Sequence, residues 1–217
     1  MKTKILPALA IVLFAATSTN AQITQGKYLL GGSLSYSNYQ DVQYNGSPVQ
    51  TSFSSNIQLG KVFKENTVAG VILSYSTANN DLATYKYNFY SAGLFYRKYK
   101  PLSKGFYFFG EADAVYDYSR NTQGKFEIGS EGTRYTTNGA RISFVPGLSY
   151  SVWKKMQMEL SMPNLVSLSY GRVKDERTFP ASQEIKTSKA NNFYANVNLN
   201  ASILNNFAIG FKFLLGK

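Results

Sequence analysis

FYANVNLNASILNNFAIGFKFLL, from Phe193 to Leu215, is the stretch of sequence that decides the fold. Its odd-numbered positions are mostly apolar, whereas its even-numbered positions are mostly Asn, Ser and Gly. A period of two over this length indicates an extended strand with one apolar and one polar face. The polar face carries no charge before Lys212, although a soluble sheet would present Lys and Glu to water. The pattern therefore favours a narrow polar lumen inside a barrel, with the apolar face turned toward lipid.

The N-terminus has the layout of a secretory signal peptide. Lys2 and Lys4 precede an apolar run from Ile5 to Ala16, and the small-residue site Thr19-Asn20-Ala21 follows. We therefore predict a signal peptide over 1–21. The rest of the chain has no run of the ~18 apolar residues that a spanning helix needs, so it would cross a membrane only as a closed sheet.

The composition limits the chemistry of the predicted domain, residues 22–217. Tyr and Phe are frequent, at 17 and 15 copies, and charged residues make up only 16% of the chain, which is typical of a β-barrel. The absence of Cys excludes disulfides and thiol chemistry. The absence of His removes the usual general base of serine hydrolases and the commonest zinc ligand. We expect a protein that is not an enzyme and that has no cofactor and no metal site.

Period-two stretches along the chain predict an all-β fold, an eight-stranded antiparallel up-and-down transmembrane β-barrel. The predicted strands are Lys27–Ser37, Thr51–Phe63, Thr67–Thr77, Tyr85–Lys98, Gly105–Ser119, Thr136–Val152, Met156–Arg172 and Asn192–Leu215. Each reaches the ~9–11 residues that a tilted strand needs to cross the hydrocarbon. In Tyr85–Lys98, aromatic residues on both parities leave the inward face undecided.

The predicted connections alternate in length. The long polar ones are Asn38–Gln50, Arg120–Tyr135 and Val173–Asn191, with a shorter one at Ala78–Thr84. The tight ones are Lys64-Glu65-Asn66, Tyr99–Lys104 and Trp153-Lys154-Lys155. Short turns at one end and longer loops at the other are typical of outer-membrane barrels, with the turns on the periplasmic side.

The main alternative is a ten-stranded barrel. It would break the last two strands at Met162-Pro163-Asn164 and at Leu204-Asn205-Asn206. Parity carries across both sites without a slip, and Met156–Met162 would be too short to span. We therefore interpret both sites as bulges or kinks within long strands.

Two segments carry a resemblance to a known family. The first strand reads YLLGGSLSY over Tyr28–Tyr36, and the last contains YANVNLNASILNNFAIGF over Tyr194–Phe211. With the signal peptide, they make the chain similar to the outer-membrane β-barrel domain family of Gram-negative bacteria, particularly the small eight-stranded barrels of OmpA and OmpX type. The likeness covers essentially the whole mature chain and includes no catalytic motif. It implies insertion by the barrel-assembly machinery and contact with outer-membrane lipids, including lipopolysaccharide.

Six ionisable residues fall on the predicted inward parity of the last four strands: Glu111, Asp113, Asp117, Arg141, Glu159 and Lys212. Several carboxylates in one cavity could serve acid/base catalysis of the glycosidase type. An eight-stranded barrel is only wide enough for side chains to fill, so a structural network of ion pairs is the better interpretation. We expect Arg141 to pair with Asp113 or Asp117, because an unpaired buried carboxylate is costly.

Basic residues gather at the predicted periplasmic rim. The chain has 23 Lys and Arg against 12 Asp and Glu, and removal of Lys2 and Lys4 leaves a net charge of +9. The rim set is Lys27, Lys61, Lys64, Arg97, Lys98, Lys100, Lys104, Lys154, Lys155, Lys212 and Lys217, with Glu65 as its only acid. Charges avoid the apolar band in any barrel, but the shortage of acids also suits contact with anionic lipid head groups.

Three functions remain open from the sequence. The leading hypothesis is a non-enzymatic outer-membrane protein with a filled polar lumen, which supports the envelope or presents its loops to an extracellular ligand. The alternatives are an outer-membrane enzyme acting on lipid A or another envelope glycolipid, and a narrow pore for small solutes. Nucleic acid is not expected as a partner, because an exported chain does not meet it.

Overall fold

The computed structural model describes residues 23–40, 49–80, 84–103, 105–127, 130–163, 165–180, 184–197 and 208–216. The predicted signal peptide, residues 1–21, therefore lies outside the described residues. Among the residues described, no helix is long and apolar enough to span a membrane. The strands are β1 (Tyr28–Gln40), β2 (Val49–Lys64), β3 (Thr67–Asn80), β4 (Tyr85–Ser103), β5 (Phe106–Gly124), β6 (Gly132–Trp153), β7 (Met156–Ser161), β8 (Val166–Thr178), β9 (Lys186–Val197) and β10 (Ala208–Leu215).

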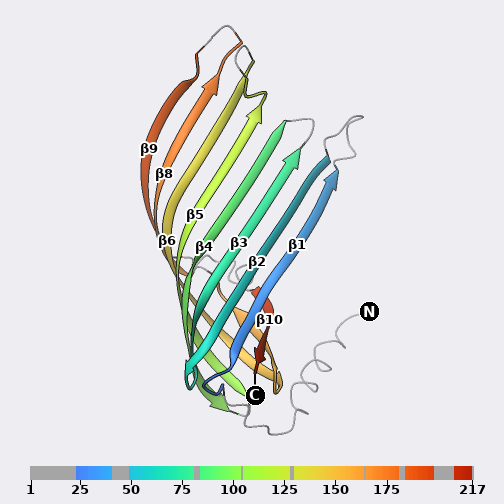
Figure 1. The fold of residues 1–217 in the computed structure, drawn as a ribbon, viewed down its shortest axis with the longest axis vertical. Coiled ribbons are helices and arrows are strands. Elements are labelled where there is room, and N and C mark those ends of the chain that lie inside the picture. The colour runs from blue at the N-terminus through green and yellow to red at the C-terminus, as the bar shows by residue number, and fades with distance from the viewer. Residues whose placement is uncertain are drawn as a thin grey trace, which may run out of the picture.

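These strand segments form a closed eight-stranded antiparallel barrel, which confirms the predicted fold class (Figure 1). Each of β1 to β6 pairs with the next strand in the chain, and the ring closes through β7 and β10 back to β1. Closure on β1 runs from Tyr28, which pairs with Leu215, to Gly31, which pairs with Lys212. Beyond Gly31, the described part of β1 pairs only with β2, and the described strands form a wide, curved wall there.

The seventh strand position is shared by β7 and β8, which follow one another along β6. Ser161 at the end of β7 pairs with Gly147, and Val166 at the start of β8 pairs with Phe144. The interruption falls at Pro163, which has no backbone donor for a sheet. Inward parity is the same on both sides, at Ser161 and Ser167. This supports eight strand positions; the second proposed break, at Asn205-Asn206, lies outside the described residues.

The loops at the wide end are shorter than predicted, because the strands continue into them. β5 extends to Gly124, β6 begins at Gly132, and β8 continues to Thr178. At the opposite end, Tyr99–Lys104 was predicted as a tight turn, but β4 runs on to Ser103. The chain reverses near Gly105, whose φ of 87° favours glycine. The alternation of tight turns with longer loops holds.

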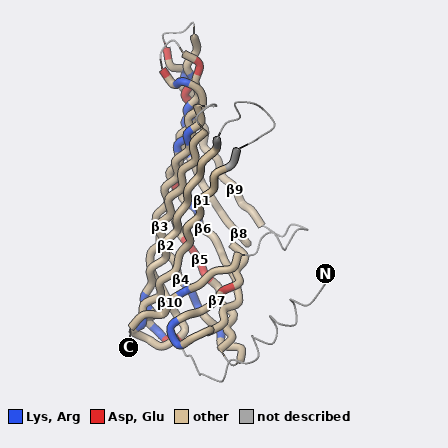
Figure 2. Tube along the Cα trace, turned by 90° about the vertical axis from the view of Figure 1, so that its right-hand side faces the viewer, with Lys and Arg blue, Asp and Glu red and all other residues tan. Residues whose placement is uncertain are grey.

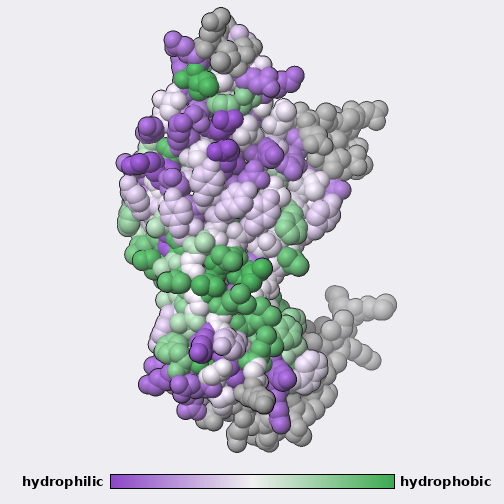
Figure 3. Space-filling view, in the orientation of Figure 1, coloured by the Kyte–Doolittle hydropathy of each residue, from purple (hydrophilic) through white to green (hydrophobic). Residues whose placement is uncertain are grey.

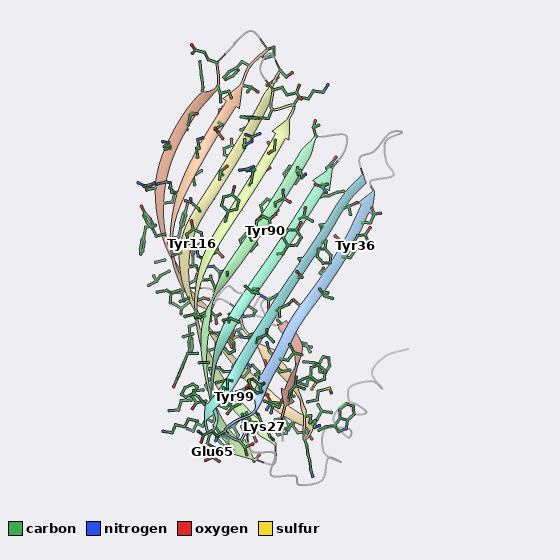
Figure 4. All side chains as sticks on the ribbon, in the orientation of Figure 1. Lys27, Tyr36, Glu65, Tyr90, Tyr99 and Tyr116 are labelled. Atoms are coloured by element: carbon green, nitrogen blue, oxygen red, sulfur yellow. The ribbon has the colours of Figure 1, made fainter. Side chains whose placement is uncertain are left out.

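The outer face is apolar over the middle of the barrel and bordered by aromatic rings. On the wide side, Phe53, Tyr75, Tyr90 and Tyr118 form a continuous row across β2 to β5, with ring centroids 5.2–6.3 Å apart. At the border toward the narrow end, Phe63 packs on Tyr96 and Phe106 packs on Tyr150. Figure 3 shows a hydrophobic band across the waist with hydrophilic surfaces at both ends. In Figure 4, Tyr36, Tyr90 and Tyr116 lie at a similar height across the sheet.

The narrow end of the barrel is filled by an apolar core. Its members are Ile23, Leu29, Val62, Val68, Ile72, Phe95, Tyr99, Tyr107, Phe109 and Leu214. Ile23 precedes β1, and its carbonyl accepts a hydrogen bond from the Asn66 backbone at 3.0 Å. The lumen is therefore closed by side chains at this end.

The two faces of β5 provide a test of this arrangement. Phe109 is fully buried in the core, whereas its neighbour Phe108 is 42% exposed on the outer face. We expect Phe109→Ala to lower the free energy of unfolding by about 3–5 kcal/mol, because it leaves a cavity. Phe108→Ala is the matched control and should cost much less. Urea titration of the folded protein in detergent micelles measures both, and equal losses would contradict the assignment of faces.

Candidate functional site

A buried arginine lies at the centre of the lumen. Arg97 on β4 forms ion pairs of 2.6 Å with Glu111 on β5 and with Glu159 on β7. All three side chains are at most 7% exposed. The Arg97 guanidinium also lies 4.3 Å from the Phe109 ring centroid and donates to the Tyr99 hydroxyl at 3.0 Å. The charges are thus enclosed between the apolar core and the rest of the lumen.

Two further strands join this network through polar contacts. Gln58 on β2 donates to Glu111 at 2.8 Å, and Lys212 on β10 donates to the Gln58 side-chain oxygen. Gln157 on β7 is fully buried and accepts from the Tyr99 hydroxyl at 3.4 Å. We call Arg97, Glu111, Glu159, Gln58 and Lys212 the lumen plug. It connects side chains from five strands across the inside of the barrel.

Arg97 was predicted at the periplasmic rim, and this assignment is wrong. On β4 the exposed residues Leu94 and Tyr96 point outward, so the odd positions around them, Phe95 and Arg97, point into the lumen. The alternation of side chains along β4 therefore already indicated that Arg97 points into the lumen. It was missed because Arg97 stands beside Lys98 in a basic run, which resembles a solvated turn. Lys212 was predicted both among the lumen residues and in the basic rim, and the structure places it in the lumen.

The other predicted lumen residues, Asp113, Asp117 and Arg141, lie on the side of the plug that faces away from the apolar core. Arg141 on β6 donates to Asp117 on β5 at 3.1 Å, which is one of the two pairings expected. Asp113 instead accepts from Ser143 at 3.4 Å. Asp113, Arg141 and the plug residues line a cavity of about 400 Å³ that begins directly above the plug. The structure therefore brings together all six predicted lumen residues, with Arg97 added to them.

The predicted basic rim lies at the narrow end, as Figure 2 shows. Lys64 is in the region of the β2–β3 turn, Lys98 and Lys100 are on the outward parity of β4, and Lys154 and Lys155 form the β6–β7 turn. All five are exposed. Lys104 and Lys217 lie outside the described residues. Glu65 lies among these lysines, in the β2–β3 turn.

The undecided parity of the fourth strand is settled by its burial pattern. Tyr90 and Tyr96 are about half exposed on the outside, at 49% and 48%. Tyr85, Tyr87 and Phe89 therefore occupy the inward parity, on the wide part of the sheet and outside the buried core of the described residues. The sequence alone left the face of these aromatic side chains undecided and assigned them no functional role.

The far ends of β6, β8 and β9 carry mixed charges. Arg177 pairs with Asp175 at 2.7 Å, and Lys174 pairs with Glu176 at 2.6 Å, both within β8. Hydrogen bonding to the Asp175 carboxylate raises the pKa of Arg177. Such exposed pairs contribute little to stability. They give this part of the surface a hydrophilic character instead.

The two carboxylates of the plug are paired with the Arg97 guanidinium. Both Glu111 and Glu159 accept hydrogen bonds from the same guanidinium. In the described part of the chain, no group of three or more His, Cys, Asp or Glu is placed to hold a metal ion.

No protein-family model matches this sequence, and no curated protein matches it either.

The plug predicts a specific pattern of stability. Arg97→Ala should lower the free energy of unfolding by about 3–5 kcal/mol, because it leaves two buried carboxylates without a counter-charge. The combined variant Arg97→Met, Lys212→Met, Glu111→Gln, Glu159→Gln should recover most of this loss, since it removes all four charges of the plug together. Arg141→Ala should also destabilise, but by only about 1 kcal/mol, because its pair with Asp117 is partly exposed. Urea unfolding in micelles measures all three, and a harmless Arg97→Ala would refute the plug.

Proposed function

We propose that this chain is a non-enzymatic integral outer-membrane β-barrel protein of the small eight-stranded OmpA and OmpX type. The observation that carries the proposal is the belt of exposed apolar side chains around the barrel, bordered by aromatic rings. Leu34, Leu94 and Ile142 within this belt are 59–78% exposed. A protein in water rarely leaves so large a continuous apolar surface uncovered.

The height of the belt supports a bilayer as its surroundings. Phe53 and Phe63 lie at the two borders on the same strand, ten residues apart. At ~3.3 Å per residue and a strand tilt of ~40°, this spacing corresponds to a belt roughly 25 Å tall. That value matches the apolar band of outer-membrane barrels. The aromatic borders fit the two membrane interfaces, where amphipathic rings are favoured.

The two hydrophilic ends suit different compartments. The narrow end, with its tight turns and exposed lysines, faces the periplasm in this proposal and contacts anionic lipid head groups. The predicted signal peptide supports export, and insertion would involve the barrel-assembly machinery and the surrounding lipopolysaccharide. The wide end extends outside the cell, where β5, β6, β8 and β9 form a wall beyond the belt (Figure 1). The role in the envelope is structural support or adhesion through this wall and its loops.

Arginine substitution on the outer face of β4 tests the membrane assignment. Leu94 is in the middle of the belt, whereas Leu102 is exposed near the turn, at the irregularity of the ladder between Pro101 and Ser103. In lipid vesicles, Leu94→Arg should cost about 2–4 kcal/mol and Leu102→Arg about 0–1 kcal/mol, because the penalty depends on depth. Urea unfolding of vesicle-inserted protein measures both. Equal small effects, or a wild-type protein that remains soluble and monomeric without detergent, would refute membrane insertion.

The closed lumen predicts how the protein behaves in a planar bilayer. The core and the plug fill the narrow end, so we expect no steady single-channel openings from the wild-type protein. Phe109→Ala shortens a core side chain and should yield at most brief openings. Regular, long-lived conductance of the wild-type protein would instead favour the narrow-pore alternative.

A further inference from the structure

The inner face of the wide sheet contains a second cavity. It has a volume of about 390 Å³ and is lined by β4, β5, β6, β8 and β9. This volume lies within the ~300–1,000 Å³ of small-molecule sites. Arg141 lines both this cavity and the one above the plug, so the two spaces adjoin at that side chain. We call the cavity of 390 Å³ the upper hollow.

Two glycines lie in the floor of the upper hollow. Gly139 on β6 and Gly171 on β8 are register partners on neighbouring strands. A Cβ atom at Gly139 would collide with the backbone oxygen of Tyr170, so close packing requires glycine there. A Cβ at Gly171 would have its nearest neighbours at 3.7 Å, which is ordinary contact. The space above Gly171 is therefore open to a ligand and can also be filled by a mutation.

Aromatic side chains border this floor on both sides. Tyr87 and Phe89 line it from β4, and Tyr194 lines it from β9, with β5, β6 and β8 between them. Phe193, its neighbour on the strand, lies on the apolar outer face, so Tyr194 lies on the inner face. Tyr194 is nevertheless 54% exposed. Rings on an otherwise polar inner face offer flat surfaces for stacking.

The polar groups of the hollow offer both donors and acceptors. Arg141 donates to one carboxylate oxygen of Asp117 at 3.1 Å. The other oxygen, Oδ1, is buried and has no hydrogen-bond partner among the residues that the structure describes. Ser119, Thr137 and Asn192 add hydroxyl and amide groups to the lining. A buried acceptor without a partner is costly, so a ligand that donates to Asp117 would be stabilised.

These features distinguish between classes of ligand. Arg141 and Asp117 cancel in charge, so the hollow has no excess of either sign to attract an ion. An acyl chain would leave the unpaired oxygen of Asp117 and the surrounding hydroxyls without partners. A sugar ring suits both the aromatic surfaces and the polar groups of the hollow. Its C–H faces stack on aromatic rings, and its hydroxyls donate and accept hydrogen bonds. We propose that the upper hollow binds one or two neutral sugar units of a carbohydrate chain.

The carbohydrate could belong to an envelope glycolipid or to a free oligosaccharide, since both present the same ring chemistry. The proposal goes beyond the membrane assignment, and binding can be measured in detergent micelles without a bilayer. The vesicle experiments with Leu94→Arg test only insertion. The two proposals can therefore fail separately.

Isothermal titration calorimetry of the full chain in micelles tests the inference with two neutral probes, maltohexaose and a core oligosaccharide of lipopolysaccharide cut down to its uncharged outer hexoses. We expect saturable binding of at least one probe. Binding of the core oligosaccharide would assign the glycolipid source, and binding of maltohexaose alone would assign a free oligosaccharide. Absence of saturable binding by both up to about 10 mM would overturn the proposal, since it leaves less than ~3 kcal/mol of affinity.

Three variants locate the binding. Gly171→Leu fills the hollow and should abolish binding, and Tyr194→Ala should weaken it roughly five- to ten-fold through loss of one stacking surface. Phe193→Ala, on the opposite face of the same strand, should bind like the wild type. Gel mobility of unboiled samples verifies folding, and Tyr194→Ala provides the test alone if Gly171→Leu does not fold. Binding unchanged in Tyr194→Ala or in folded Gly171→Leu, or weakened equally in Phe193→Ala, would exclude the hollow as the site.

Discussion

The buried ion pairs of Arg97 are the interaction on which the closed end of the barrel depends. An eight-stranded ring leaves an interior that side chains must fill, and a charge placed there has to be compensated on the spot. Arg97 on β4 meets carboxylates from β5 and β7, and Gln58 and Lys212 extend the contacts to β2 and β10. These contacts join residues far apart in the chain. They therefore favour the one register in which all eight strand positions close.

The fold was predictable because the barrel repeats one simple constraint. Outward positions in the middle of the barrel are apolar and exposed, and inward positions share a narrow polar space, so a period of two persists along the strands. That constraint was enough to find the eight strand positions and to place Glu111, Glu159 and Lys212 inside. It also carried parity across Pro163, where the sheet is interrupted between β7 and β8. Strand ends were less accessible, because polar residues such as those of β8 beyond Gly171 suit a strand in water as well as a loop.

The central residue of the site escaped prediction for a related reason. Charge composition suggests a solvated turn for the run around Arg97 and Lys98, whereas parity assigns the two residues to opposite faces. The aromatic residues of β4 obscured that parity, since Tyr87 and Phe89 line the inner face and Tyr90 the outer one. A side chain that is both charged and inward is compatible with a barrel only if partners exist. Those partners lie 14 and 62 residues away in sequence, and their proximity becomes evident only when the register is known.

The contrast between the two halves of the interior follows from the sizes of the inward side chains. At the narrow end, Tyr99, Phe109 and Arg97 fill the inside of the ring, so the lumen is closed there. At the wide end, Gly139 and Gly171 remove side chains from the floor of the sheet, while Tyr87 and Tyr194 remain at its borders. A ligand that donates to the unpaired oxygen of Asp117 would remove the cost of leaving that acceptor buried. The closed half therefore serves as the scaffold, and the open half is where a ligand can be recognised.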